Sequence, residues 1–90
     1  MIKLQKCQFK PGNLGFTVVD WLPSEIRNVE KGSQFYKAGV RAGWKIIRVN
    51  NEPFVGLQEL KRISNHYHYT LTFEHSRVSN NTFMTFCFDI

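Results

Sequence analysis

The stretch from Val29 to Phe54, VEKGSQFYKAGVRAGWKIIRVNNEPF, decides the fold because it carries a helix start, a helix stop and a turn in order. Ser33 can cap a short helix over residues 35–38, and Gly39 can end it, since glycine readily takes left-handed backbone angles. Residues 44–50 then read as a strand, and Asn50-Asn51 is a pair that tolerates such angles in a turn. The stretch therefore predicts a short helix, a strand and a tight turn.

Strand and helix patterns surround this stretch on both sides. Strands are predicted at residues 2–9, where apolar residues alternate with polar ones, and at 14–21 and 26–29, with Pro23 ending the second. Apolar residues at 57, 60 and 63 have helical spacing and predict an amphipathic helix over 57–64. Strands are also expected at 66–74 and 82–90, with a short extended piece after Asn51.

The expected fold class is mainly β with two short helices. We expect a partly open barrel or sandwich of five to six strands, capped by the helices, and an extra strand-like segment at the C-terminus. Ninety residues form one domain, which is too small for a deep cleft with a second lobe. We place this domain at residues 1–75 and treat residues 76–90 as a C-terminal extension.

The charges and cysteines restrict the function less than the pattern does. A net charge of +5 fits an acidic partner, an anionic membrane or nucleic acid, but the lysines and arginines are scattered as on a solvated surface. Cys7 and Cys87 lie among alternating apolar residues and are predicted to be small core or sheet residues. No segment resembles a signal peptide or a transmembrane span, so we expect a reducing, cytoplasmic setting.

No set of residues predicts catalysis or a cofactor. The sequence shows no Ser-His-Asp pattern, nucleophile elbow or convincing pair of carboxylates, so an enzyme is not expected. His66 and His68 would share one face of a strand, and a metal would need His75 as third ligand. Plain packing is the favoured interpretation of these histidines, and we predict no metal site.

Residues 10–20, KPGNLGFTVVD, leave two interpretations open. The Pro11, Gly12, Asn13 and Gly15 cluster before an apolar strand is typical of an ordinary tight turn. The same cluster is also typical of a loop that aims backbone N–H groups at an anion.

The chain resembles the PDZ domain family over about residues 3–74. The resemblance rests on NLGF at residues 13–16, on the stretch 29–54 and on the amphipathic LQELKRI at 57–63. The sequence departs from the family pattern at two positions. Trp44 stands where an aspartate is usual, and Asn13 stands where the family prefers glycine, asparagine being the next best residue for a positive φ angle.

The resemblance implies capture of the free C-terminus of a partner protein, which adds as a strand beside the second strand and second helix. The residues implied for carboxylate binding are Lys10, Asn13, Leu14, Gly15 and Phe16. Those implied for the peptide groove are Phe16, Val18, Leu57, Lys61 and Ser64. Gly15 would leave room for the carboxylate, so we expect Gly15→Val to weaken binding without unfolding the domain.

The groove residues suggest the preferred ligand. Leu57 cannot donate a hydrogen bond to a hydroxyl, so apolar residues are expected at the last and third-last ligand positions. Lys61 can either pair with an acidic ligand side chain or extend into water. A shift of one residue in the helix would bring Gln58 or Arg62 to the groove instead.

Residues 82–90, TFMTFCFDI, admit three interpretations. The first is an extra strand that covers an exposed edge of the sheet, and the second is the start of a further segment. The third is a ligand: Phe88-Asp89-Ile90 would bind another copy of the chain and drive self-association. From the resemblance we expect no nucleic-acid partner, and we expect contact with a membrane only indirectly. Alternatives are a regulatory PDZ module of a larger enzyme, or a basic surface for anionic lipid or nucleic acid. The residues considered for that surface are Lys3, Lys6, Lys10, Lys31, Lys37, Arg41, Lys45 and Arg48.

Overall fold

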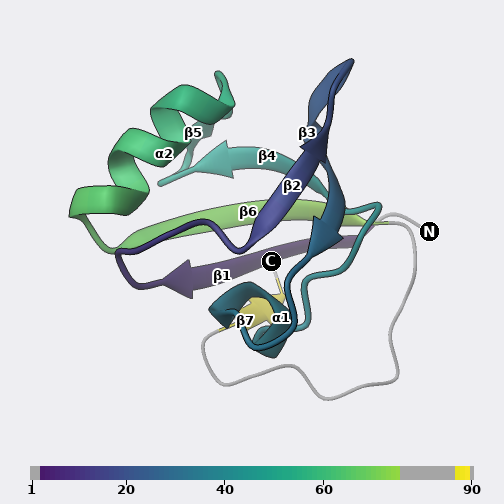
Figure 1. The fold of residues 1–90 in the computed structure, drawn as a ribbon, viewed down its shortest axis with the longest axis horizontal. Helices are drawn as coiled ribbons and strands as arrows, with labels where there is room; N and C mark the ends of the chain where they lie inside the picture. Colours follow the sequence, from purple (N-terminus) through teal and green to yellow (C-terminus); the bar gives the residue numbers. More distant parts are fainter. Residues whose placement is uncertain (1–2, 76–86, 90) are drawn as a thin grey trace.

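The computed structural model describes residues 3–75 and 87–89 and shows seven strands and two helices (Figure 1). In chain order the elements are β1 (Lys3–Phe9), β2 (Phe16–Val19), β3 (Leu22–Val29), α1 (Gln34–Lys37), β4 (Lys45–Val49), β5 (Glu52–Pro53), α2 (Leu57–His66), β6 (Tyr69–His75) and β7 (Cys87–Asp89). This order is the predicted one, and the expectation of a mainly β protein with two short helices is confirmed.

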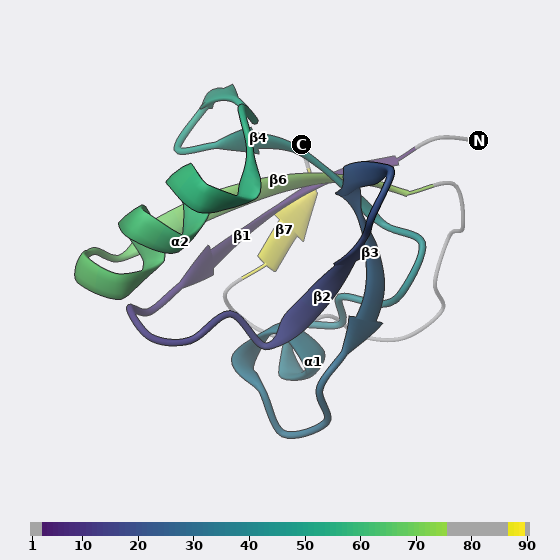
Figure 2. The same cartoon turned by 45° about the horizontal axis from the view of Figure 1, so that its top comes forward.

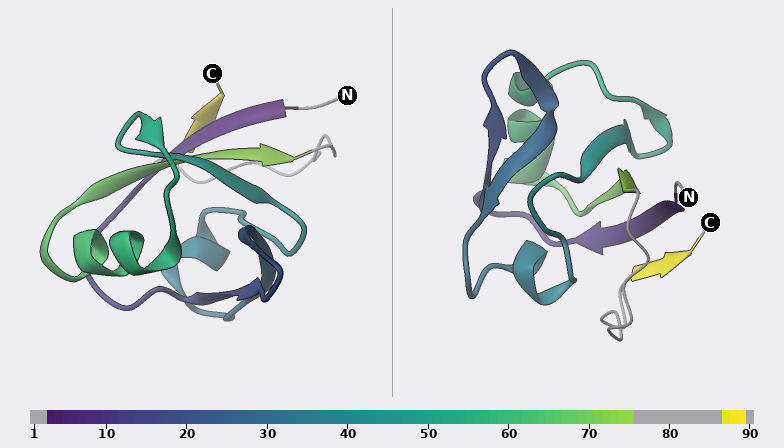
Figure 3. Two further views of the ribbon diagram at one scale, coloured as in Figure 1. Left: turned by 90° about the horizontal axis from the view of Figure 1, so that it is seen from above. Right: turned by 90° about the vertical axis from the view of Figure 1, so that its right-hand side faces the viewer.

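The strands pair in the order β2-β3-β4-β6-β1-β7, with β5 attached to β4, and every pairing is antiparallel. The sheet bends strongly, so that β2 and β3 lie across the interior from β1 and β6 (Figures 2 and 3). Within the described residues, β2 has β3 as its one neighbour and therefore forms an edge of the sheet.

The β2–β3 hairpin differs from the prediction around Pro23. We expected this proline to end a strand reaching Trp21, but it lies inside β3, which begins at Leu22. Val19 pairs with Leu22 across a tight turn, and the register shifts on both sides of Val18. A proline donates no backbone hydrogen bond, so it is tolerated where such irregularities interrupt the regular ladder.

The helix and turn signals are confirmed in the middle of the chain. Ser33 is the N-cap of α1, and its Oγ accepts a hydrogen bond from the Tyr36 N–H at 3.1 Å. Gly39 follows the helix with a φ of 97°. Asn50 and Asn51 have φ angles of 51° and 69°, as their place in the turn between β4 and β5 requires.

The predicted strand at 66–74 begins later than expected. Helix α2 continues to His66, and β6 starts at Tyr69. His66 and His68 therefore do not share a strand face, and that expectation is wrong. The backbone N–H of Tyr67 still donates to the Ile63 carbonyl at 2.9 Å, which extends the helix by about half a turn beyond its predicted end at Ser64.

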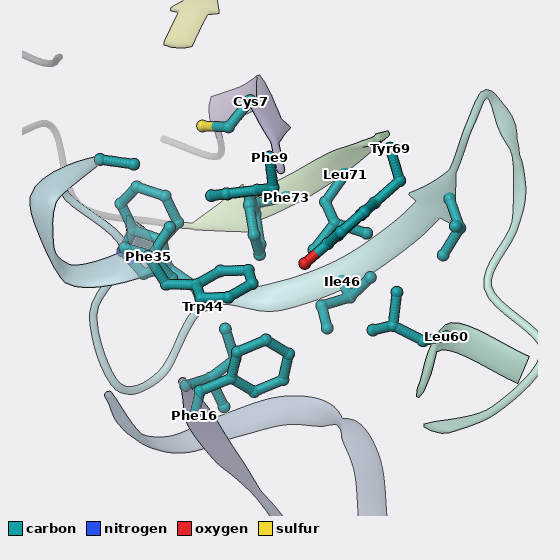
Figure 4. Close-up of a cluster of buried hydrophobic side chains, with 14 residues drawn as sticks. Cys7, Phe9, Phe16, Phe35, Trp44, Ile46, Leu60, Tyr69, Leu71 and Phe73 are labelled. Carbon is teal, nitrogen blue, oxygen red and sulfur yellow. The ribbon is translucent and has the colours of Figure 1, made fainter. Parts of the chain in front are cut away.

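Aromatic side chains fill the space enclosed by the sheet and helices (Figure 4). Phe35 of α1 stacks on Phe9 with ring centroids 4.3 Å apart and meets the edge of Phe16 at 4.9 Å. Trp44, where the family pattern has aspartate, is buried and stacks on the His75 ring at 4.0 Å. The packing of α1 onto both β1 and β2 therefore joins the two sides of the bent sheet.

Cys7 is buried, as predicted, but it is disulfide-bonded. Its register partner on β7 is Cys87, the one other cysteine of the sequence. Disulfides persist in oxidising compartments. A disulfide is therefore not what a reducing compartment would favour. The cytoplasmic location stays a prediction.

Strand β7 covers the edge of β1, pairing Cys87, Phe88 and Asp89 with Cys7, Lys6 and Gln5. This supports the extra-strand interpretation for residues 87–89. Residues 82–86 and Ile90, the rest of that predicted segment, lie outside the described residues. Over the part of the chain that the structure describes, none of the helices has the length and apolar character needed to cross a membrane.

Candidate functional site

The loop between β1 and β2 is anchored to both helices. The Lys10 N–H donates to Gln34 Oε1 of α1, and Gln34 Nε2 donates back to the Lys10 carbonyl, each at 2.9 Å. The Gly12 N–H donates to the Ser64 carbonyl of α2 at 2.7 Å. These three hydrogen bonds fix the path of the chain into β2.

Gly12, rather than Asn13, supplies the positive backbone angle of this loop. Gly12 has a φ of 145°, whereas the non-glycine residues with positive φ in the described ranges are Asn50 and Asn51. The positive φ angle expected at Asn13 is therefore wrong, while its place among the carboxylate-binding residues stays a prediction. Its side chain is exposed, as is that of Lys10.

Gly15 makes room for α1 and not for a ligand. A Cβ at this position would lie 2.3 Å from the Ser33 Cβ and 2.7 Å from the Ser33 Oγ. Real Cβ atoms do not approach other atoms so closely, so any side chain here would displace the start of α1. The expectation that Gly15→Val spares the fold is wrong, because valine would disturb the packing beneath the loop.

Leu14, which is partly buried, and Gly15, which is buried, lead the chain into β2 with amide groups that are unpaired in the described backbone. Among the described residues, the N–H groups of Leu14 and Gly15 have no hydrogen-bond partner, while the Gly15 carbonyl accepts the Glu30 N–H at 2.7 Å. That bond makes Phe16 and Val29 a non-hydrogen-bonded pair of the antiparallel ladder. The N–H and C=O of Phe16 consequently point away from β3, toward the unpaired edge of β2.

The predicted site residues in β2 and just before it divide between core and surface. Phe16 is buried against Phe35 and belongs to the core, whereas Leu14 and Val18 are partly buried and pack against that core. Leu14 and Val18 thus supply apolar surface beside the row of amides.

Helix α2 supplies the predicted groove residues Leu57, Lys61 and Ser64. Leu57 is partly buried against the core, Lys61 is exposed, and Ser64 is 1% exposed with its Oγ donating to the Lys61 carbonyl at 3.0 Å. Leu60, one of the three apolar residues with helical spacing, is fully buried.

The alternative groove residue Arg62 is engaged elsewhere on the helix. Its guanidinium hydrogen-bonds the carboxylate of Glu59 through both Nε and Nη2. The hydrogen bond from Arg62 lowers the pKa of the Glu59 carboxyl. Both side chains are exposed, so the pair adds little to stability.

The three histidines do not come together as one metal-binding group within the described residues. His66 ends α2, His68 precedes β6, and His75 is buried at the far end of β6, with its Nε2 3.1 Å from Gln5 Oε1. Over residues 3–75 and 87–89, no group of three histidine, cysteine or acidic residues is placed to hold a metal ion.

Comparison with known proteins gives no matching family model, no matching curated protein and no matching solved structure. The residues themselves therefore carry the functional argument.

Sequence reasoning did not find two residues that shape the site. Gln34 holds the backbone of Lys10, and Ser33 occupies the space beside Gly15. Ser33 was recognisable as a helix cap, but no local signal relates either residue to a loop some twenty positions earlier in the chain.

The Gly15–Ser33 contact is testable with a double-mutant cycle. Gly15→Ala should lower the free energy of unfolding by about 1–3 kcal/mol, since the added methyl overfills a packed contact. Ser33→Gly removes the two atoms that the methyl would meet at 2.3 and 2.7 Å, and leaves Phe35 Cδ2 at 3.4 Å. It should itself cost a few tenths of a kcal/mol, because glycine is an adequate N-cap. In the Ser33→Gly background, Gly15→Ala should be markedly less destabilising when urea unfolding is followed by circular dichroism. Additive effects of the two substitutions would contradict the contact.

Proposed function

We propose that this chain binds the C-terminal segment of a partner protein, which adds as a strand along the open edge of β2. The observation that carries the proposal is the row of amides at Leu14, Gly15 and Phe16, without partners in the described backbone at the point where β2 begins. A terminal carboxylate is the ligand that such a row suits, because an anion accepts several N–H groups at once.

Pairing of the remaining peptide follows from the ladder geometry. Phe16 directs both its N–H and its C=O toward the free edge, so an extended peptide can exchange backbone hydrogen bonds with it. Antiparallel addition would make the peptide the next strand of the sheet after β2. This mode of binding needs no catalytic group, which agrees with the expectation that the chain is not an enzyme.

Apolar side chains define the proposed ligand preference. Leu14 and Val18 from the β2 side and Leu57 and Ile63 from α2 are all partly buried against the same core. Alternate residues of an extended peptide point to the same side, so the last and third-last ligand residues would meet this apolar surface. Lys61, exposed on α2, is available to an acidic residue between them.

Self-association through the C-terminus is a second hypothesis, and it requires a rearrangement of β7. Phe88 and Asp89 pair with β1 of their own chain in β7. Segment 88–90 can act as a ligand for another copy only after β7 leaves β1. Capture of a separate partner does not require this rearrangement and is the function we favour.

Peptide binding is best tested by calorimetry with matched acid and amide peptides. A library of C-terminal peptides selects a ligand, and the same sequence with an amidated end should bind at least tenfold more weakly. Loss of a charge-assisted hydrogen bond typically costs about 1.5–3 kcal/mol, which corresponds to that factor or more. Equal affinities for the two forms would refute carboxylate capture. Affinity that falls steeply with salt would instead favour phosphate binding on a basic surface.

The role of Leu57 is testable as a change of specificity. Leu57→His adds a hydrogen-bond donor, so the variant should shift preference about fivefold or more toward serine or threonine at the third-last ligand position. Val55→His is the matched control, because Val55 is 79% exposed and precedes the helix. The same shift in both variants, or in neither, would contradict the placement of Leu57 at the peptide.

A further inference from the structure

A recess lies where α1 meets the ends of β1 and β6. It has a volume of about 670 Å³ and is lined by Gln8 and Lys10, by Gln34 and Lys37 of α1, and by Asn50 and His68, among others. We call it the α1 hollow. Of the residues assigned above to the peptide site, Lys10 alone lines it, so the α1 hollow is separate from the β2 edge.

The charge of the α1 hollow has one sign. Lys10 and Lys37 line it and both are exposed, while none of its lining residues is an aspartate or a glutamate. Lysine ammonium groups are common phosphate ligands because they act as compact point charges. An anion in the hollow would therefore be attracted by two lysines, and no carboxylate in the lining would repel it.

The polar walls of the α1 hollow are held in place before any ligand arrives. Gln34 is fixed by its two hydrogen bonds to the Lys10 backbone. Asn50 accepts the Thr70 N–H through Oδ1 at 2.9 Å, and its Nδ2 has no partner among the described residues. Side-chain amides that are already ordered lose little conformational freedom on binding. They can donate to hydroxyl or phosphate oxygens of a ligand.

We propose that the α1 hollow binds a phosphate monoester carried on a small, hydroxyl-bearing molecule. Lys10 and Lys37 would hold the phosphate, and the amides of Gln34 and Asn50 would contact the hydroxyl-bearing part. The volume lies within the range of about 300–1,000 Å³ that is typical of small-molecule sites. Sugar phosphates and the headgroups of phosphorylated inositol lipids share this chemistry, and the inference does not depend on the peptide-binding proposal.

The test is an NMR titration with fructose 1,6-bisphosphate, inorganic phosphate and vesicles containing phosphatidylinositol 4-phosphate. Signals of Lys10, Asn50, Thr70 and the Gln34 side-chain amide should shift with the sugar bisphosphate. The Lys10→Gln/Lys37→Gln variant should weaken binding at least fivefold. Lys31→Gln/Lys61→Gln is the matched control, because it lowers the net charge equally at two exposed lysines outside the hollow.

Each outcome decides the proposal. If only Lys10→Gln/Lys37→Gln loses binding of the sugar bisphosphate, the proposal is supported. If only this variant loses binding and the vesicles are the only probe that binds, the proposal is supported with a lipid headgroup as the ligand. Equal weakening by both double variants would overturn it in favour of diffuse charge attraction. It is also overturned if inorganic phosphate binds as tightly as the bisphosphate, or if no probe binds.

Discussion

The close approach of Gly15 to Ser33 is the constraint on which the rest of the structure depends. With no Cβ at residue 15, the backbone entering β2 can lie directly against the cap of α1. The Glu30 N–H bonds to the Gly15 carbonyl, and Phe16 meets the edge of Phe35 one residue later. The same contacts that close the core therefore determine where the first amides of β2 lie. Peptide binding at the proposed site would therefore depend on this contact, because a residue that blocks the contact would move the amides of the site.

The two edges of the sheet differ in whether a further strand covers them. β7 pairs with β1 and covers one edge, whereas β2 keeps its outer side unpaired within the described residues. Exposed strand edges invite unwanted pairing, and proteins normally shorten or cover them. β2 has four residues, which limits such pairing while leaving enough backbone for a short peptide. An edge that is kept short and open, beside apolar surface from α2, is what strand addition by a peptide requires.

The sequence predicted the features that depend on local chemistry. The Ser33 cap, the Gly39 stop, the Asn50-Asn51 turn and the helix from Leu57 all follow from side-chain and backbone preferences of neighbouring residues. Features set by distant contacts were missed or misjudged. Pro23 lies inside β3 because the hairpin ladder is irregular there, and Gly15 is required by a side chain eighteen positions later. The candidate residues were named from a family resemblance, but the reason for Gly15 and the anchoring by Gln34 needed the tertiary structure.

The central claim is that the amides of Leu14, Gly15 and Phe16 receive a chain's terminal carboxylate. An NMR titration of nitrogen-15-labelled protein with one apolar-ended peptide, in its acid and amide forms, tests it most directly. The account predicts that these three amide protons shift downfield, more strongly with the acid. The Glu30 amide, already bonded to the Gly15 carbonyl, should move little. Unchanged signals at residues 14–16, or the same shifts with both forms of the peptide, would contradict the account.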